Sequence, residues 1–217
     1  MWHFCNNRQM EIDKKYEILR SLPTYGPMYI SISDSEEPFF SEGFVVRFYK
    51  SDRSQWVANF ALGGSNYLKV FDSPNHNLIF VIAGGRAYVI NPDYEKPQKI
   101  FGITISEVIV TENQSLIFAN DINIIFFDNS NGEFWESNQI SWDGIRNLKL
   151  SGDILYGESY FPTNLNELWR DFSINLKIRK VEGGTYNEFS QNNIVLEVRD
   201  NAMLSKKTYN KPWWKFW

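Results

Sequence analysis

Leu78-Ile79-Phe80, Leu116-Ile117-Phe118 and Ile154-Leu155-Tyr156 are three similar triplets spaced 38 residues apart, and they decide the fold that this sequence predicts. Each triplet follows a polar turn, and each turn follows an alternating apolar run, as at Leu68 and Val70. A fixed period of about 20–50 residues marks units that bury their apolar faces against copies of themselves. We therefore expect the triplets to lie on equivalent, buried inner strands of successive sheets.

A second kind of hairpin alternates with these triplets. Residues 44–49 and 55–60 form apolar-rich runs around a polar turn, and the same pattern returns at 87–101 and at 123–136. Asn131-Gly132 in the last of these is a strong hairpin signal, because both residues tolerate positive φ. Two hairpins make a unit of four short antiparallel strands, which predicts repeats at 65–102, 103–140 and 141–184.

The fold class expected is therefore all-β, with repeated four-stranded antiparallel meanders and one N-terminal helix. Over residues 44–182 this pattern resembles the blades of β-propellers, and the resemblance implies a propeller-like arrangement. Residues 28–62 then form a partial unit, which residues 185–204, with a predicted strand at 194–198, are expected to complete from the other end of the chain. A β-sandwich is the structural alternative. We expect one β domain over 1–217, with an N-terminal helical segment at 1–23, meander repeats at 28–204 and an aromatic tail at 205–217.

Two local helices are predicted. Ile12, Tyr16 and Leu19 share one face of a helix over residues 7–21, which Pro23 would end. The insertion Phe161–Arg170 in the third repeat is expected to hold a short helical turn, with Leu165, Leu168 and Trp169 facing inward.

Composition and charge narrow the function classes. The net charge is −4, and the basic residues are scattered, so no nucleic-acid partner is expected. One cysteine excludes an intrachain disulfide, and no apolar run is long enough for a membrane span or a secretory signal. A cytoplasmic protein is the default expectation.

Residues that could carry chemistry are few. His3 and His76 do not combine with Cys5 into a metal-binding pattern, and His76 is interpreted as an exposed turn residue. Acids such as Asp128 and Asp153 lie in predicted turns, where Asp caps the backbone. We therefore expect no enzyme activity, no cofactor and no metal. A carbohydrate-active propeller remains an alternative, because paired carboxylates can hydrolyse glycosides.

The C-terminal residues Lys211–Trp217 combine four aromatic side chains with two lysines. Such a segment can dock on its own domain or on a subunit, bind a partner, or lie at a lipid interface. All three remain open at this stage.

The expected function is a non-catalytic protein-binding module. One specific version is a bacterial immunity protein that masks a basic toxin, since an acidic surface complements a basic cleft. A structural subunit of a larger assembly is a further alternative. Loops held by a rigid scaffold are the expected contact regions. The candidate partner-binding residues are acids beside aromatics in two loops: Asp34, Glu36, Glu37, Phe39, Phe40, Glu167 and Trp169.

Overall fold

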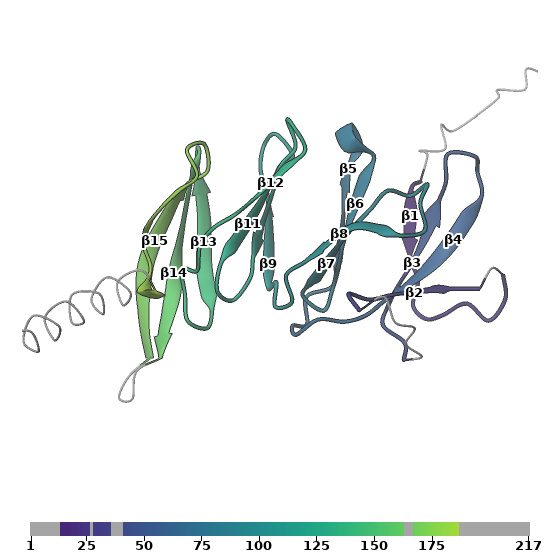
Figure 1. Cartoon of the computed structure of the whole chain (residues 1–217), viewed down its shortest axis with the longest axis horizontal. Coiled ribbons are helices and arrows are strands. Elements are labelled where there is room, and N and C mark those ends of the chain that lie inside the picture. The colour runs from purple at the N-terminus through teal and green to yellow at the C-terminus, as the bar shows by residue number, and fades with distance from the viewer. Residues whose placement is uncertain (1–13, 27, 36–40, 163–166, 187–217) are drawn as a thin grey trace, which may run out of the picture. The chain divides into compact units, whose positions relative to one another are not determined.

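The computed structural model describes residues 14–26, 28–35, 41–162 and 167–186. These residues form four four-stranded sheets (Figure 1). One 3-10 turn, Pro74–His76, connects two strands of the second sheet. The expected all-β fold built from four-stranded, blade-like repeats is confirmed.

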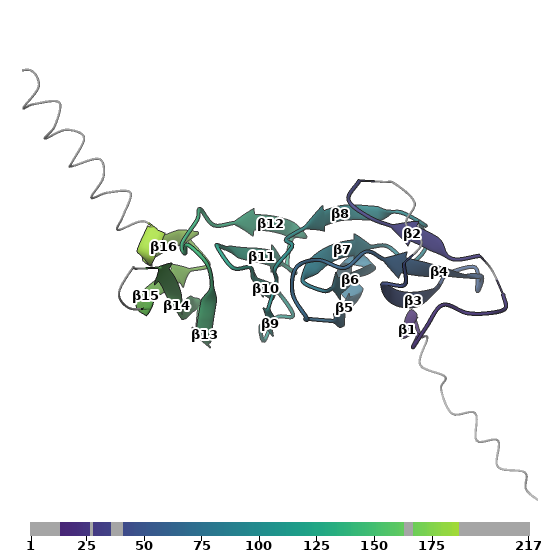
Figure 2. The same cartoon turned by 90° about the horizontal axis from the view of Figure 1, so that it is seen from below.

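The first sheet contains β1 (Tyr16–Ile18), β2 (Ile30–Ile32), β3 (Phe44–Tyr49) and β4 (Gln55–Phe60), in the order β1-β3-β4-β2. The predicted β3–β4 hairpin is confirmed. The β2 strand runs parallel to β4 at the edge of the sheet (Figure 2), whereas β1 and β3 are antiparallel. All four strands come from residues 16–60, so no C-terminal strand is needed to complete this sheet, and residues 194–198 lie outside the described residues.

The predicted N-terminal helix is wrong where the structure describes it. Tyr16–Ile18 is a strand, and Tyr16 pairs with Phe48 across β1 and β3. Tyr, Glu and Ile alternate there, and the edge of β3 offers backbone partners that offset the weak helical pattern. The earlier part of the predicted helix, residues 7–13, lies outside the described residues.

The remaining three sheets follow the predicted repeats closely. Their strands fall within 65–102, 103–140 and 141–184, so the predicted 38-residue organisation is confirmed. In chain order they are β5 (Lys69–Ser73), β6 (Leu78–Ala83), β7 (Arg86–Ile90) and β8 (Pro97–Phe101) in the second sheet; β9 (Glu107–Val110), β10 (Leu116–Ala119), β11 (Ile124–Asp128) and β12 (Glu133–Glu136) in the third; and β13 (Ile145–Ser151), β14 (Ile154–Pro162), β15 (Glu167–Asn175) and β16 (Lys180–Gly183) in the fourth.

The described chain divides into two compact units. The first unit holds residues up to 120 together with 124–134, and the second holds 121–123 together with 135 onward. The first unit therefore contains the first two sheets and most of the third. The second contains the fourth sheet and the segment that leads into it.

Within the first unit, three sheets pack in succession around two layers of apolar side chains. The central strand β6 is buried at every position. Ile79 and Val81 join the cluster shared with the first sheet, whereas Phe80 and Ile82 join the cluster shared with the third. Alternate residues of a strand point to opposite faces, so a strand covered on both sides must be apolar throughout.

Glycines allow the connections between these sheets to approach very closely. Gly84 and Gly85 form the β6–β7 turn with positive φ of 59° and 86°. The Gly63 N–H donates to the carbonyl of Ala83, and the Ile105 N–H donates to the carbonyl of Gly85. A Cβ at Gly63 would lie 2.5 Å from the carbonyl oxygen of Ile103, so a side chain does not fit there. The backbones of neighbouring repeats are thereby hydrogen bonded to each other.

The triplet alignment is confirmed for strand position but only in part for burial. β6, β10 and β14 are each the second strand of their sheets, and Phe80 and Phe118 are fully buried. Ile154 and Tyr156 were expected to be buried, yet Ile154 is half-buried and Tyr156 is 46% exposed. In β14 the buried triplet residue is Leu155, because the described residues cover only one face of the fourth sheet.

The insertion Phe161–Arg170 was predicted to hold a helical turn, but the residues at both of its ends belong to strands, β14 and β15. Phe161 pairs with Leu168 and Tyr160 pairs with Trp169, so the insertion lengthens the β14–β15 hairpin to nine residues in each strand. Leu168 is exposed rather than inward-facing. Residues 163–166, including the expected cap Thr163 and Leu165, lie outside the described residues. No helix in the described part of the chain is long and apolar enough to cross a membrane.

Candidate functional site

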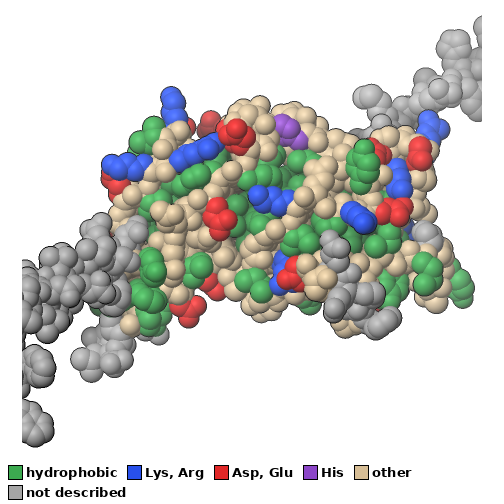
Figure 3. Space-filling view, in the orientation of Figure 1, with side chains coloured by type: hydrophobic (Ala, Val, Ile, Leu, Met, Phe, Trp, Pro, Cys, Tyr) green, Lys and Arg blue, Asp and Glu red, His purple; other side chains and the backbone are tan. Residues whose placement is uncertain are grey.

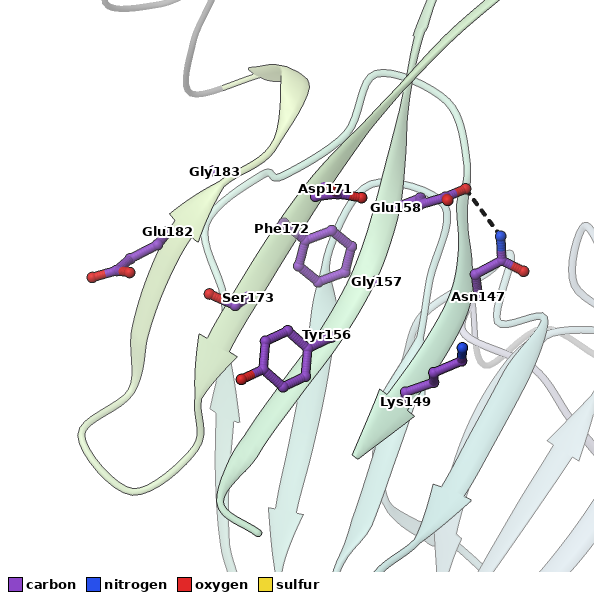
Figure 4. Close-up of a pocket in the computed structure, with 10 residues that line it drawn as sticks. All are labelled: Asn147, Lys149, Tyr156, Gly157, Glu158, Asp171, Phe172, Ser173, Glu182 and Gly183. Carbon is purple, nitrogen blue, oxygen red and sulfur yellow. Dashed lines mark hydrogen bonds between the residues drawn. The ribbon is translucent and has the colours of Figure 1, made fainter. Parts of the chain in front are cut away.

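The fourth sheet presents one exposed face that is hollowed by a groove. We call this face the open face. The groove has a volume of about 740 Å³. Figure 4 shows its lining on β13 to β16: Asn147, Lys149, Tyr156, Gly157, Glu158, Asp171, Phe172, Ser173, Glu182 and Gly183. The opposite face of the same sheet buries Leu155 and Ile174, and Phe172 is also buried although it borders the groove.

Strand pairing brings these side chains together. Tyr156 is opposite Lys149 on one side and Ser173 on the other, while Glu158 is opposite Asp171. Directly paired residues point to the same face of a sheet, with Cβ atoms about 5 Å apart. The open face is therefore a continuous surface assembled from four strands.

A β-bulge in β13 concentrates polar contacts on Glu158. The register of β13 against β14 shifts between Arg146 and Lys149, and Asn147 adopts a positive φ of 55°. Asn tolerates this conformation better than most residues. Arg146 Nε lies 2.7 Å from Glu158 Oε2, and Asn147 Nδ2 donates to the same oxygen at 3.0 Å. These hydrogen bonds, the one from Arg146 first, lower the pKa of the Glu158 carboxyl.

Arg146 also links this carboxylate to an aromatic pair. Its guanidinium carbon lies 3.7 Å from the centroid of the Trp169 ring, and Trp169 packs against Tyr160 with ring centroids 5.1 Å apart. The Arg146 guanidinium is thus held between the Glu158 carboxylate and the Trp169 indole. These contacts fix the Arg146 and Trp169 side chains, although neither is fully buried. Trp169, a predicted partner-binding residue, is half-buried at this end of the open face.

Two further acids lie on the groove. Glu182 pairs with Lys180 at 2.7 Å, and this hydrogen bond lowers the pKa of the Glu182 carboxyl. Asp171 is exposed on β15, and its carboxylate has no hydrogen bond or ion pair with any described residue. Asp171 is the acidic group of the open face that is available to a ligand.

The other predicted partner-binding residues are placed only in part. Asp34 Oδ1 lies 2.9 Å from Arg86 Nη1, in the first unit. Glu167 begins β15, and its backbone pairs with Pro162. Glu36, Glu37, Phe39 and Phe40 lie outside the described residues, so their role stays a prediction.

A second, smaller groove lies in the first unit between the edge strands β2 and β8. Its volume is about 380 Å³, and Ile30, Asp34, Lys96 and Ile100 are among its lining residues. Figure 3 shows positive and negative side chains interspersed over the face in view. The described residues contain no group of three or more metal-ligating side chains.

His76 is not the solvated turn residue that the sequence suggested. Its Nε2–H donates to the carbonyl of Asn129 at 2.8 Å, and its ring packs edge-on against Phe127. Ser73 Oγ donates to Asn129 Oδ1 at 2.8 Å, so two residues of the second sheet bind one turn of the third. His76 therefore has a structural role.

Sequence reasoning missed most of the open face, including Arg146, Asn147, Tyr156, Glu158 and Asp171. The available signal was the alternation in β14, where Tyr156, Glu158 and Tyr160 recur at every second position. The bulge at Asn147 had no comparable signal.

The comparisons with known proteins add little to this description. No protein-family model matches the chain, and no curated protein matches it significantly. Among solved structures, the N-terminal domain of Nup159, a β-propeller, matches with a TM-score of 0.35 and 13% sequence identity. The match covers 56% of this chain and 34% of that one, so it spans about a third of the solved domain, and no functional conclusion follows from it.

Proposed function

We propose that this chain is a non-catalytic module that binds a protein partner through the open face of the fourth sheet. The observation that carries the proposal is the contrast between sheets. β6 is buried on both faces, whereas β14 leaves Tyr156 46% exposed above a groove of about 740 Å³. A rigid sheet that displays aromatic side chains around a hollow suits recognition of a folded surface.

The residue types on this face are those that dominate protein interfaces. Tyr, Trp and Arg are enriched at binding hot spots, and the open face carries Tyr156, Trp169 and Arg146. Arg146 and Trp169 already hold each other in place, so less conformational freedom is lost when a partner binds.

Charge favours a basic partner. The chain carries a net charge of −4, and Asp171 lies on the groove with no ion pair among the described residues, whereas Glu158 and Glu182 are paired with Arg146 and Lys180. Complementary charge accelerates association and selects partners. The finer proposal is an immunity protein that neutralises a basic toxin by covering its active cleft.

The test is site-specific photo-crosslinking in the native host. A benzophenone amino acid at Tyr156 is expected to capture a discrete basic protein, whereas the same group at Tyr94 is expected to capture none. Tyr94 is a matched control, because it is also exposed, at 63%, but lies in the first unit.

The captured protein then allows quantitative binding measurements. We expect Tyr156→Ala to weaken binding at least tenfold, and Asp171→Lys to slow association and reduce its salt dependence. Tyr94→Ala is expected to leave binding unchanged. Equal affinity for all variants would place the interface elsewhere. For the finer proposal, co-expression is expected to rescue growth of cells that produce the captured protein.

A carbohydrate-active function is the second candidate, and one observation favours it. Glu158 and Asp171 face each other on adjacent strands beside exposed aromatic rings, as glycoside-cleaving pairs can. However, Glu158 is already engaged by Arg146 and Asn147, and its lowered pKa does not suit an acid that must donate a proton. Glycan turnover that disappears in Glu158→Gln and Asp171→Asn would favour this candidate over the binding module.

A further inference from the structure

The C-terminal segment Lys211–Trp217 is the most distinctive motif that the proposed function leaves unexplained. It contains Trp213, Trp214, Phe216 and Trp217 together with Lys211 and Lys215, and it lies outside the described residues. We propose that this segment binds the open face of its own chain and competes there with the protein partner. Binding of the segment rests on the geometry of the open face, and only the competition rests on the proposed function.

The exit point of the chain brings the segment within reach. The last described residues are held against the fourth sheet, since the Gly184 N–H donates to the carbonyl of Asp171 and the Thr185 hydroxyl donates to the carbonyl of Tyr160. The Thr185 N–H also donates to Ser159 Oγ, and the Tyr186 N–H donates to the carbonyl of Ile140. Because Ser159 alternates with the residues of the open face, the described chain ends beyond β16 on the opposite side of the sheet, and the segment must pass around the β16 edge to reach Tyr156.

The intervening chain is long enough without being too long. Residues 187–210 separate the exit point from the segment. At no more than about 3.3–3.6 Å per residue, these residues can span at most about 80 Å. A four-stranded sheet is only about 15 Å wide. The segment can therefore reach all of the open face, at an effective concentration on the order of millimolar.

The chemistry of the two surfaces is complementary. Tyr156 offers an exposed ring on which an indole can stack, and Asp171 offers a carboxylate that no described side chain engages. Lys211 and Lys215 supply the matching positive charge.

Competition follows from the effective concentration. A segment that binds with an intrinsic Kd of about 0.1 mM, at a local concentration of about 1 mM, occupies roughly nine-tenths of the open faces. It then weakens the apparent affinity of a partner for the same face about tenfold. Loss of the segment is expected to restore that affinity.

The first test uses the full-length chain alone. A benzophenone at Tyr156 is expected to crosslink within the same chain to a peptide containing residues 211–217, with a yield that does not change on dilution. The same group at the matched position Tyr94 is expected to give no such product. A yield that falls on dilution would instead indicate contact between two chains and overturn the proposal.

The second test uses hydrogen exchange in the full-length chain. Replacing Trp213, Trp214, Phe216 and Trp217 with Ser is expected to deprotect β14 and β15. Lys211→Glu with Lys215→Glu is expected to have a smaller effect in the same strands. The matched pair Lys206→Glu and Lys207→Glu, with the same charge change outside the segment, is expected to have none. Unchanged hydrogen exchange in the Ser variant overturns the proposal. A second result also overturns it: the wild-type chain binds anionic vesicles through these aromatic side chains, and the segment does not crosslink to position 156.

The two proposals fail separately. If Tyr156 crosslinks to the basic partner but not to residues 211–217, the open face is a partner site and the segment does not occupy it. If Tyr156 crosslinks to the segment and to no partner, the segment covers the face and the proposed function is wrong.

Discussion

β6 and β14 begin with aligned triplets and occupy the same position in their sheets, yet they differ in burial. Every residue of β6 is buried, because the first and third sheets cover its two faces. β14 buries Leu155 and exposes Tyr156 on the opposite face. Position in a repeat therefore fixes the strand and its register, whereas the sheets that pack on it decide which side chains become core and which remain available for binding.

The largest expected effect tests the burial side of this comparison. Phe118→Ala should cost about 3–5 kcal/mol of unfolding free energy, because Phe118 is fully buried between Phe80 and Phe101. Tyr156→Ala should change stability by no more than about 0.5 kcal/mol. Urea denaturation of the two variants measures both. Similar losses would mean that the two triplets are equivalent after all.

An intermediate effect distinguishes a buried turn from an exposed one. Asn129 is buried in the β11–β12 turn, where it accepts from Ser73 Oγ and donates to the carbonyl of Asn113. Asn129→Ala should cost about 1–3 kcal/mol, because it leaves the buried Ser73 hydroxyl without its acceptor.

Asn175 caps the β15–β16 turn by accepting from the backbone N–H groups of Lys177 and Ile178, in a region open to water. Asn175→Ala should cost no more than about 1 kcal/mol, because water replaces the lost acceptor. Thermal unfolding of both variants makes the comparison, and a larger loss at Asn175 would contradict it.

The smallest expected effect concerns two carboxyls with lowered pKa values. The backbone N–H and the hydroxyl of Ser51 lower the pKa of Asp93, whereas Arg146 is the main cause at Glu158. In each case stability is present above the unfolded pKa, near 4, and is lost as the pH falls through the folded pKa.

The effect of a neutral hydrogen-bond donor on a carboxyl pKa is less sensitive to salt than the effect of an exposed ion pair. Added NaCl should therefore raise the pKa of Glu158 more than that of Asp93, and Ser51→Ala should raise only that of Asp93. NMR titration of the two side chains checks both statements. Equal salt responses would indicate that Arg146 acts as a neutral donor would.

The sequence was sufficient to predict the fold where the pattern is local and repeated. The hairpin of β3 and β4 and the three repeat ranges follow from alternation and polar turns. It was insufficient where partners are distant or elements are short. Tyr16–Ile18 is too brief to show a period, and its strand depends on the edge of β3. The exposure of Tyr156 depends on whether another sheet packs over it, which no residue of the triplet encodes.

The close glycine contacts at Gly63, Gly84 and Gly85 also determine how this chain tolerates change in length. Backbone hydrogen bonds join each repeat of the first unit to the next, so an insertion at these connections would uncouple neighbouring sheets. Duplication of a whole repeat, such as residues 65–102, would preserve every junction and both apolar faces. Growth by complete repeats is therefore the route by which such an array can lengthen.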